Sequence, residues 1–312
     1  MIIRLGYVAI SKALNITSSG TITYTNYLKE ENKNEKLDKI IKSNLDNLEK
    51  ILNYNVKNNI HFYRLTSKLI PLATHKDISF EYINKYKDYY DKISKIIDKN
   101  NMRVDVHPDQ FCVLNSTNKE TINNSIEILK YHINILEALK IKSPVIVLHT
   151  GSSVFGKEKS ITRFVNNFNK LPDNIKNSIV IENDDKIYNA SDVLNLCKKI
   201  NRPMVLDYHH HICNPCDNID DMLGKIFDTW KDIRPKVHFS SPKNKTKKDF
   251  RSHHDYINSD DFIQFIEKIK KYNVDIDVMI EAKAKDDALF RLVRELKYKT
   301  DYKFIDETSF EV

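Results

Sequence analysis

Eight short apolar runs along the chain each end in a residue that is suited to catalysis or to metal binding. Read in order, these residues are Tyr7, Arg64, His107, His149, Glu182, Asp207, His238 and Glu281. Six of them are His, Asp or Glu, the side chains that ligate divalent metals. In a barrel of parallel strands, active-site residues gather at the carboxyl ends of the strands. The pattern therefore predicts a site for several metal ions at one mouth of a barrel.

A run of three histidines, His209 to His211, follows Asp207 and Tyr208. Imidazole suits Mn, Fe or Zn better than Mg. At least one of the three rings is expected to be a surface or core residue. Asp207 and His210 lie three residues apart, where the strand bends into its loop, and this spacing lets them converge on one metal.

Glu182 and Glu281 each end an apolar strand. A single buried glutamate is most often a member of an ion pair. Two of them at equivalent strand ends, flanked by histidine and aspartate strand ends, favour metal ligation instead.

His61 begins a strand and His132 lies on a helical face, so we expect both to be structural.

Lys236 precedes His238 by two residues, so the two side chains share one face of their strand. A bare ammonium among metal ligands is unfavourable unless it pairs with a carboxylate or is chemically modified. Spacing alone favours an ion pair with a glutamate inside the mouth. Carboxylation of the amine, which would make it an anionic ligand, is the alternative.

The segment SPKNKTKKDFRSHHDY follows the seventh apolar run. Taken alone it is a solvated basic loop, but next to a metal cluster its Lys and Arg side chains favour contact with a phosphate backbone. Metals with a basic rim indicate metal-assisted phosphodiester hydrolysis. A sugar isomerase barrel uses the same ligand types, so spacing does not exclude it.

Cys213 and Cys216 have no second half of a zinc pattern and are expected to be reduced loop thiols.

The elements that must position these residues alternate along the chain. The runs RLGYVA, HFYRLT, RVDVH, VIVLH, IVIEN, MVLDY, KVHFS and DVMIEA read as strands, and the stretches between them have helical periodicity. Ser191 and Asp192 are plausible helix starts. Eight βα units predict a TIM (β/α)8 barrel in one domain, residues 1–312. An open doubly wound sheet is disfavoured because the chain has no glycine-rich phosphate loop.

The composition is that of a globular protein: 312 residues, 41% hydrophobic and 30% charged. The net charge of +7 is compatible with a polyanionic partner without requiring one. The amino-terminal apolar run is too short for a signal peptide, and no run reaches the roughly 18 apolar residues of a membrane span. We therefore expect a cytoplasmic protein.

At these residues the chain resembles the UV damage endonuclease family. The resemblance covers nearly the whole length and rests on RLGYVA, FYRLTSKLIPLATH, HPDQF, VIVLHTGS, IVIENDDK, VLDYHH, RPKVHFSSPK, RSHHDY and MIEAKAKDDAL, in the family order. It implies a TIM-barrel repair enzyme that is related to endonuclease IV and to sugar isomerases. It also implies two or three divalent metals, usually manganese, and incision immediately 5′ of cyclobutane dimers and 6-4 products, with abasic sites cut as well.

The resemblance also implies roles for individual residues. Its metal ligands correspond to His107, His149, Glu182, Asp207, His210, His238, His253 and Glu281. His253, rather than His254, matches the histidine of the RSH motif. Glu182, Lys236, His75 and His238 are the implied catalytic residues, with Glu182 bridging metals. Lys236 matches a carboxylated lysine, and His75 an active-site histidine.

The family senses damage with a Gln-Tyr pair that is pushed into the duplex, and the pair here is Gln110-Phe111. Phe111 keeps the stacking face and loses the hydroxyl. Tyr7 matches an aromatic residue of the lesion pocket, whereas Ser11 stands where a family member has Asn. The other expected DNA contacts are Arg64, Lys243 and Arg251, although Arg64 serves equally well to hold a carboxylate.

The expected partner is damaged double-stranded DNA, bound by a monomer with no membrane attachment. Two other classes of protein are possible. A sugar-phosphate isomerase of the same barrel type would lack the basic loop and the Gln110-Phe111 pair. A catalytically silent DNA-binding module would show gaps in the metal-ligand set, and the sequence shows none.

Overall fold

The computed structural model describes residues 1–246 and 249–312. Its main feature is a closed barrel of eight parallel strands, since β1 pairs with both β4 and β10. The barrel strands are β1 (Ile2–Val8), β4 (Phe62–Leu65), β5 (Arg103–Val106), β6 (Ile146–His149), β7 (Ile179–Glu182), β8 (Met204–Asp207), β9 (Lys236–Phe239) and β10 (Ile276–Ile280). The predicted TIM barrel and all eight predicted strands are confirmed.

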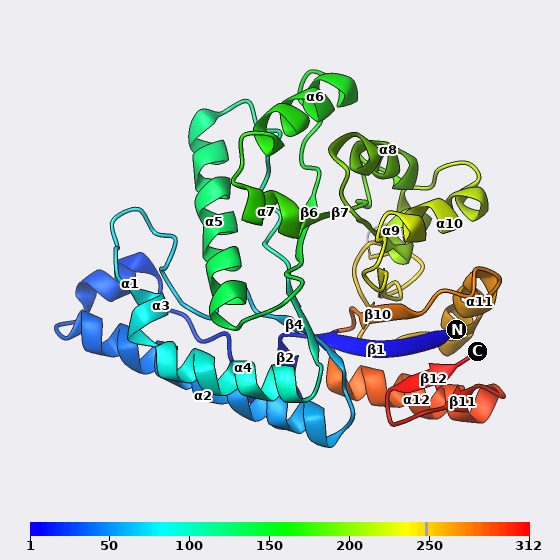
Figure 1. Ribbon diagram of the computed structural model, residues 1–312, viewed down its shortest axis with the longest axis horizontal. Helices are drawn as coiled ribbons and strands as arrows, with labels where there is room; N and C mark the ends of the chain where they lie inside the picture. Colours follow the sequence, from blue (N-terminus) through cyan, green and yellow to red (C-terminus); the bar gives the residue numbers. More distant parts are fainter. Residues whose placement is uncertain (247–248) are drawn as a thin grey trace.

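Helices surround the barrel (Figure 1). On one side lie α5 (Lys119–Ala138), α6 (Lys157–Phe168), α7 (Asp173–Ser178) and α8 (Ala190–Ile200). On the opposite side lie α2 (Lys33–Lys57), α4 (Lys87–Lys99) and α12 (Asp286–Lys299). The remaining helices are α1 (Tyr24–Lys29), α3 (Tyr82–Lys85), α9 (Tyr208–Cys213), α10 (Ile219–Asp228) and α11 (Ser259–Lys270). In the described part of the chain, no helix is both long and apolar enough to span a membrane.

The helices are amphipathic, and their apolar faces cover the outside of the barrel. In α2, Leu45, Leu48, Ile51 and Leu52 have no exposed surface, as their predicted periodicity requires. The start of α8 differs from the prediction, because Asn189 is the N-cap and Asp192 completes a capping box with it. Asp192 therefore acts from the third helical position and does not begin the helix.

The two ends of the chain meet beside β1. The short strand β12 (Ser309–Glu311) pairs antiparallel with the first residues of β1 and with β11 (Lys303–Phe304). The amide of Val312 donates to the carbonyl oxygen of Met1 at 3.0 Å. A second small sheet, β2 (Ile10–Ser11) with β3 (Ile16–Thr17), follows β1. The sequence pattern predicted neither of these additions.

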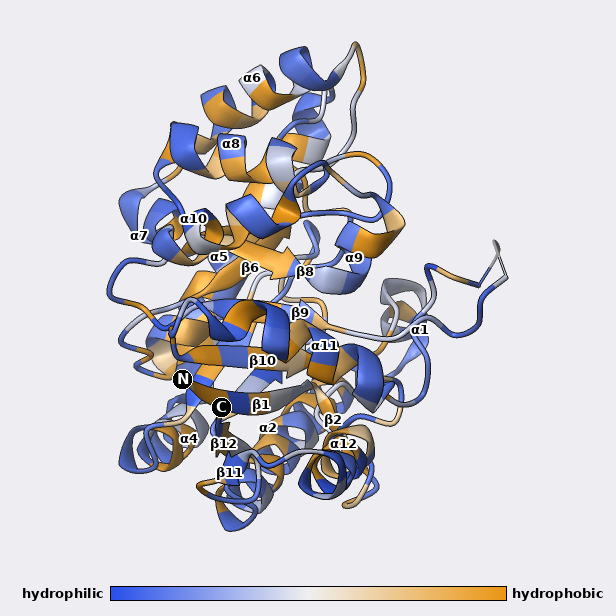
Figure 2. Ribbon diagram, turned by 90° about the vertical axis from the view of Figure 1, so that its right-hand side faces the viewer, coloured by the Kyte–Doolittle hydropathy of each residue, from blue (hydrophilic) through white to orange (hydrophobic). Residues whose placement is uncertain are grey.

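Strand direction defines the two ends of the barrel. Figure 2 shows β1 and β8 running toward the side where α9 and α1 lie, which is the carboxyl-end mouth. In register, His149 is opposite Glu182, and Asp207 is opposite His238. All four side chains therefore enter the same layer of the barrel interior, at the mouth.

The opposite end of the barrel is closed by a buried ion cluster. Asp277 has no exposed surface and accepts hydrogen bonds from Arg4 at 2.6 and 2.8 Å and from Arg103 at 2.8 Å. The Arg103 guanidinium also lies over the rings of Phe62 and Trp230. Burial opposes ionisation of Asp277, but the two arginines outweigh it and hold the pKa of this carboxyl below its usual value.

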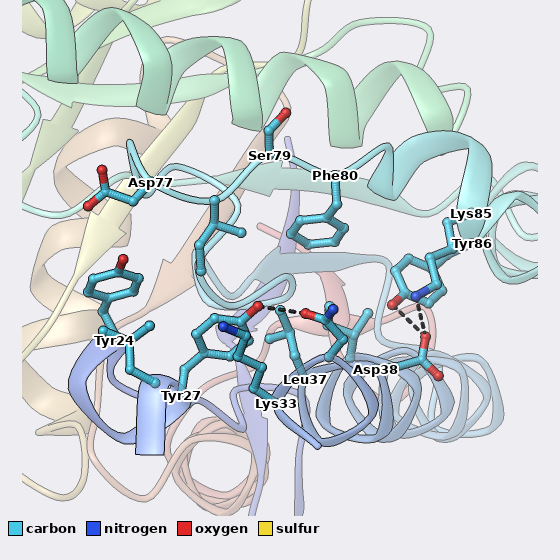
Figure 3. A pocket seen from close by; sticks show the side chains of 14 residues that line it. Tyr24, Tyr27, Lys33, Leu37, Asp38, Asp77, Ser79, Phe80, Lys85 and Tyr86 are labelled. Carbon is cyan, nitrogen blue, oxygen red and sulfur yellow. Dashed lines mark hydrogen bonds and ion pairs between the residues drawn. The ribbon is translucent and has the colours of Figure 1, made fainter. Parts of the chain in front are cut away.

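A cavity of about 380 Å³ lies outside the barrel, between α1, α2 and the segment that leads into α3 (Figure 3). Tyrosine and charged side chains line it, but they satisfy one another. Asp38 accepts from Tyr86 at 2.9 Å and from Lys85 at 2.8 Å, and Asn34 accepts from Tyr27 at 2.6 Å. The cavity therefore presents no cluster of unpaired charge that calls for a ligand.

We predict that Asp277→Asn lowers the free energy of unfolding by about 3 kcal/mol, because two partly buried arginines lose their buried anion. Urea unfolding measures this, with Asp98→Asn, in an exposed pair with Lys142, as the matched control that changes little. The pKa of Asp277 is lowered on folding, so its contribution should persist above about pH 4 and be lost as the pH falls further. Equal midpoints for both variants would contradict a structural role of the cluster.

Candidate metal centre at the mouth of the barrel

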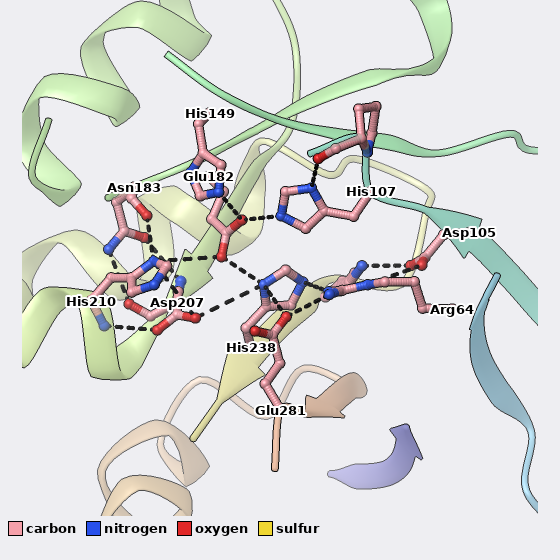
Figure 4. Close-up of polar contacts among 12 residues, drawn as sticks. Arg64, Asp105, His107, His149, Glu182, Asn183, Asp207, His210, His238 and Glu281 are labelled. Atoms are coloured by element: carbon pink, nitrogen blue, oxygen red, sulfur yellow. Dashed lines mark hydrogen bonds and ion pairs between the residues drawn. The ribbon is translucent and has the colours of Figure 1, made fainter. Parts of the chain in front are cut away.

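The predicted metal ligands converge at the mouth (Figure 4). Two groups have ligand atoms that all lie within 4.8 Å of one another: His107, His149 and Glu182 form one, and Glu182, Asp207 and His238 form the other. These residues come from five consecutive strands, β5 to β9. These five of the eight residues that end the apolar runs therefore lie in one cluster.

Glu182 belongs to both groups, and each of its oxygens faces a different one. Oε2 lies 2.8 Å from His107 Nε2 and 3.6 Å from His149 Nε2. Oε1 lies 2.7 Å from His238 Nδ1 and 3.6 Å from His210 Nδ1. A carboxylate with its two oxygens divided in this way is placed to bridge two cations.

The cluster gathers three carboxyl groups in a buried place. Among the described residues, Glu182, Asp207 and Glu281 face one buried guanidinium, that of Arg64. Burial and the neighbouring charges of Glu182 and Glu281 raise the pKa of Asp207, and its Oδ2 has no hydrogen-bond partner in the described structure. A buried carboxyl oxygen without a partner is costly, so a divalent cation fits beside Asp207 in this donor set.

The protonation states of some of the histidines suit metal binding. Burial opposes protonation of His210, but Asp207 and Glu182 outweigh it and raise the pKa of His210 to about 9, so a cation at His210 would have to displace a proton. Burial lowers the pKa of His149, and it lowers the pKa of His238 to about 4. Both rings are therefore neutral near pH 7, as ligation requires. Burial likewise lowers the pKa of His253, whose Nδ1 lies 3.9 Å from Glu281 Oε2 at the edge of the cluster.

Polar backbone groups orient the ligands. His210 Nδ1 lies 2.9 Å from the carbonyl oxygen of Asn183, and His107 Nδ1 lies 2.9 Å from that of Pro108. The Asn183 side chain exchanges two hydrogen bonds with the backbone of Asp207, at 2.9 and 3.0 Å. Such contacts fix ring orientation at metal sites. Asn183 was not predicted, although its place directly after Glu182 on a buried strand is a signal.

Arg64 is a correction to the predicted DNA contacts. Its Nη1 donates to Glu281 Oε1 at 2.6 Å, and its Nη2 lies 2.6 Å from His238 Nε2. The side chain is almost fully buried, so the guanidinium is out of reach of a phosphate. The sequence left two roles open for Arg64, and in the structure it holds a carboxylate.

Lys236 lies one layer below His238 and has no exposed surface. Its Nζ lies 2.5 Å from Asp105 Oδ2 and 5.4 Å from the centre of the Phe62 ring. Burial lowers the pKa of Lys236 to about 8, and the nearby Arg64 acts in the same direction. The ion pair that spacing favoured is present, but its partner is Asp105 and not a glutamate. Asp105 shares a strand face with His107, which is the signal that was missed.

Tyr7 and Ser11 do not face the mouth. Tyr7 is fully buried, and its hydroxyl donates to Asn55 of α2 at 2.8 Å, so it packs outside the barrel. The prediction that Tyr7 contacts a lesion is therefore wrong for this structure. Ser11 is also buried and donates to Asp286 Oδ2 at 2.6 Å.

His75 lies outside the metal cluster. Its ring stacks on Tyr24 at 3.9 Å between centroids, and its Nδ1 lies 3.9 Å from Asp77 Oδ2. The long segment after β4 carries it to α1, whose Tyr24 lines the cavity in Figure 3. In the described structure none of its contacts reaches the cluster, so the geometry does not support a catalytic role for His75.

The predicted DNA-contacting residues on the loops are exposed. Phe111 is 72% exposed and follows the exposed Gln110 in a turn after β5. Lys243 and Arg251 are half exposed and pair loosely with aspartates, each at 3.5 Å. Such surface pairs are weak and exchange readily for another anion. Lys247 and Lys248 of the predicted basic loop lie outside the described residues.

Comparison with known proteins gives a consistent family. A family model described as UV-endonuclease UvdE matches residues 3–310. The UV DNA damage endonuclease of Bacillus cereus (strain G9842) is 41% identical over 303 residues, which is 95% of each chain. The crystal structure of SacUVDE has a TM-score of 0.86 at 35% identity and covers 95% of this chain and 98% of that chain.

A more distant structure shares the fold alone. Endonuclease IV from Thermus thermophilus has a TM-score of 0.57 at 10% identity, with 95% of this chain and 100% of that chain covered. The barrel is therefore the common framework, and the ligand cluster must be judged from the residues of this chain.

We predict that Mn²⁺ raises the melting temperature of the wild-type protein, since a cation that binds only the folded state stabilises it by about 2.7 kcal/mol at a hundredfold excess over Kd. Glu182→Gln should abolish most of this shift, because it removes the charge common to both ligand groups. Glu127→Gln, on the exposed face of α5, is the matched control. Isothermal titration calorimetry gives the stoichiometry, and unchanged Mn²⁺ binding by Glu182→Gln would remove Glu182 from the site.

Proposed function

Because this chain belongs to the UV-endonuclease UvdE family, we propose that it incises duplex DNA immediately 5′ of UV photoproducts, using two or three divalent metal ions. The family makes it a DNA repair endonuclease. The lesion class, the side of cleavage and the metal dependence are the proposed part. The observation that supports them most is the pair of ligand groups that meet at Glu182, inside a mouth with an exposed Gln110-Phe111 turn on its rim.

The metal ions are proposed to be held by the eight predicted ligands. His107 and His149 would hold one ion with Glu182, and Asp207 and His238 would hold a second on the other oxygen of Glu182. His210, His253 and Glu281 lie around these groups and would complete the ligand set. Manganese suits this mixture of imidazole and carboxylate. Bound there, the ions would activate a water and neutralise charge on the scissile phosphate.

Residues of the chain have separate tasks in this scheme. Arg64 holds Glu281 and His238 in place from inside the barrel. Lys236 lies one layer further into the barrel. Its lowered pKa increases the fraction of neutral amine, which is the form that carboxylation requires. Carboxylation of Lys236, in which the neutral amine adds to CO₂ and releases a proton to leave a carbamate, is part of the proposal. It would exchange the pair with Asp105 for contacts to the guanidinium of Arg64.

The Gln110-Phe111 turn is proposed to enter the duplex at the lesion. The turn is held by Asp109, whose side chain accepts from the Phe111 amide at 2.9 Å and whose carbonyl accepts from the Cys112 amide at 3.0 Å. An apolar ring inserted between bases supports the extrusion of damaged nucleotides, and stacking needs no hydroxyl. Lys243 and Arg251 are proposed to contact phosphates, which makes binding weaker at higher salt.

We further propose that residues 1–312 act as one domain and as a monomer on damaged double-stranded DNA in the cytoplasm. Of the two alternatives, the sugar-phosphate isomerase has the barrel and its ligand types in its favour, but it leaves the exposed Phe111 without a role. The silent DNA-binding module leaves the convergence of five ligand residues without a role.

The proposed activity predicts lesion-dependent nicking. With Mn²⁺, the protein should nick UV-irradiated plasmid and leave unirradiated plasmid largely intact, and a chelator should stop the reaction. End-labelled oligonucleotides with one photoproduct locate the cut. Equal nicking of both plasmids would contradict lesion specificity.

Glu182→Gln should lose incision and keep much of its DNA affinity, since Glu182 lies below the DNA-facing rim.

Substitutions of Phe111 separate damage sensing from hydrolysis. Phe111→Ala should weaken lesion-duplex binding by about fivefold or more, as loss of one base-stacking contact does. Phe111→Tyr should retain binding. Both variants should bind Mn²⁺ like the wild type. If Phe111→Ala binds and cuts damaged duplex as well as Phe111→Tyr does, the wedge role is wrong.

A further inference from the structure

A second exposed aromatic side chain stands on the rim next to the Gln110-Phe111 turn. Phe155 is 73% exposed, close to the 72% of Phe111, and the neighbouring Val154 is 44% exposed. It lies on the segment of residues 150–156 between β6 and α6, and β6 pairs with β5, the strand before Phe111. The two rings are therefore carried by adjacent loops at the same end of the barrel.

The backbone holds Phe155 in this exposed position at a cost. Phe155 has a φ of 63°, a left-handed conformation that bulky residues rarely adopt, and Gly156 follows with a φ of 94°. Three hydrogen bonds fix the turn. Arg163 Nη2 donates to the Val154 carbonyl at 2.6 Å, Ser160 Oγ donates to the same oxygen at 3.0 Å, and the Gly156 amide donates to the Ser153 carbonyl at 2.8 Å. The exposed ring is thus built into the loop.

Asn115 fastens this loop to the one that carries Phe111. Its buried side chain donates to the Ser152 carbonyl at 2.6 Å and accepts from the Ser152 amide at 3.2 Å. Arg163 Nε donates to the carbonyl of Asn115 at 2.9 Å. A Cβ on Gly151 would lie 2.4 Å from Asn115 Oδ1, so the contact requires glycine there. The two rim loops are therefore tied together.

The distance from the metal centre favours DNA as the partner of this ring. Phe155 is six residues beyond His149, so its backbone lies within about 20 Å of that ligand. This is about six base-pair steps of B-DNA. A duplex with one phosphate in the mouth therefore extends across the rim on which both rings stand.

We propose that Phe155 is a second DNA-contacting residue, which stacks on an exposed base or sugar beside the gap made at Gln110-Phe111. Asn115 and Arg163 are positioning residues that set the spacing of the two rings. The proposal rests on the proposed function, and it adds to it a contact that keeps the opened duplex from closing. Stacking of this kind does not depend on the base sequence.

The test is lesion-duplex binding by Phe155→Ala, measured by fluorescence anisotropy, with Phe155→Tyr as the conservative variant. Phe155→Ala should weaken binding by about fivefold or more, Phe155→Tyr should restore it, and Mn²⁺ binding should not change. Tyr298→Ala is the matched control, because Tyr298 is 90% exposed on α12. Affinity for lesion duplex that is the same in Phe155→Ala and the wild type would overturn the proposal.

A double-variant cycle tests the link between the loops. A fluorescent base analogue opposite the lesion reports opening of the duplex. The double variant with Phe111→Ala and Phe155→Ala should lose less of this opening, as a free energy, than the two single variants lose when their losses are added. Strict additivity would overturn the positioning role of Asn115 and Arg163. If the wild type fails to nick irradiated plasmid, the proposed function itself fails. If it nicks normally and Phe155→Ala does too, only the role of Phe155 fails.

Discussion

The structure of the mouth depends on compensating the buried charge of Glu182. This carboxylate has almost no exposed surface, and its two oxygens are contacted by histidines from different strands. Burial opposes ionisation of Glu182, but contacts with the His238, His149 and His107 imidazoles hold the pKa of this carboxyl well below its usual value. The anion thus persists where water does not reach, and the carboxylates beside it add to the same charge. A site of this kind fits cations, and the proposed metal ions would be held where several imidazoles surround one glutamate.

The same constraint continues down the barrel axis. Below the ligand layer, Arg64 stands between Glu281 and Asp105, and Asp105 pairs with Lys236. At the far end, Asp277 is held by Arg4 and Arg103. Valine side chains with Trp230 fill the other part of the interior. The interior is therefore a column of paired charges against an apolar wall, and it fixes the angle at which each ligand reaches the mouth.

The barrel and most of the residues that cluster at its mouth could be predicted from the sequence because both follow from local patterns. Alternation along a strand places His107, His149 and Glu182 on the inner face. The prediction for Tyr7 was wrong because the last reactive residue of an apolar run need not lie on the inner face. Arg4 contacts Asp277 inside the barrel, and Tyr7, an odd number of residues further along the strand, therefore points outward to α2. The ion partner of Lys236 could not be predicted, since Asp105 is 131 residues away and only the register of the closed barrel brings it close. The contacts of His75 depend on a long loop, which periodicity does not describe.

In the proposed function, damage sensing and hydrolysis use the same two strands. β5 leads through His107 to Phe111, and β6 leads through His149 to Phe155, so each strand supplies a ligand and then a rim loop. Both imidazoles belong to the same ligand group, and Asn115 joins the two loops above it. A displacement of the rim by an inserted ring would therefore be transmitted over a few residues to the ligands on Oε2 of Glu182. Because the path from the rim loops to these histidines is short, the position of the opened duplex and the arrangement of the proposed metal ligands would be set together.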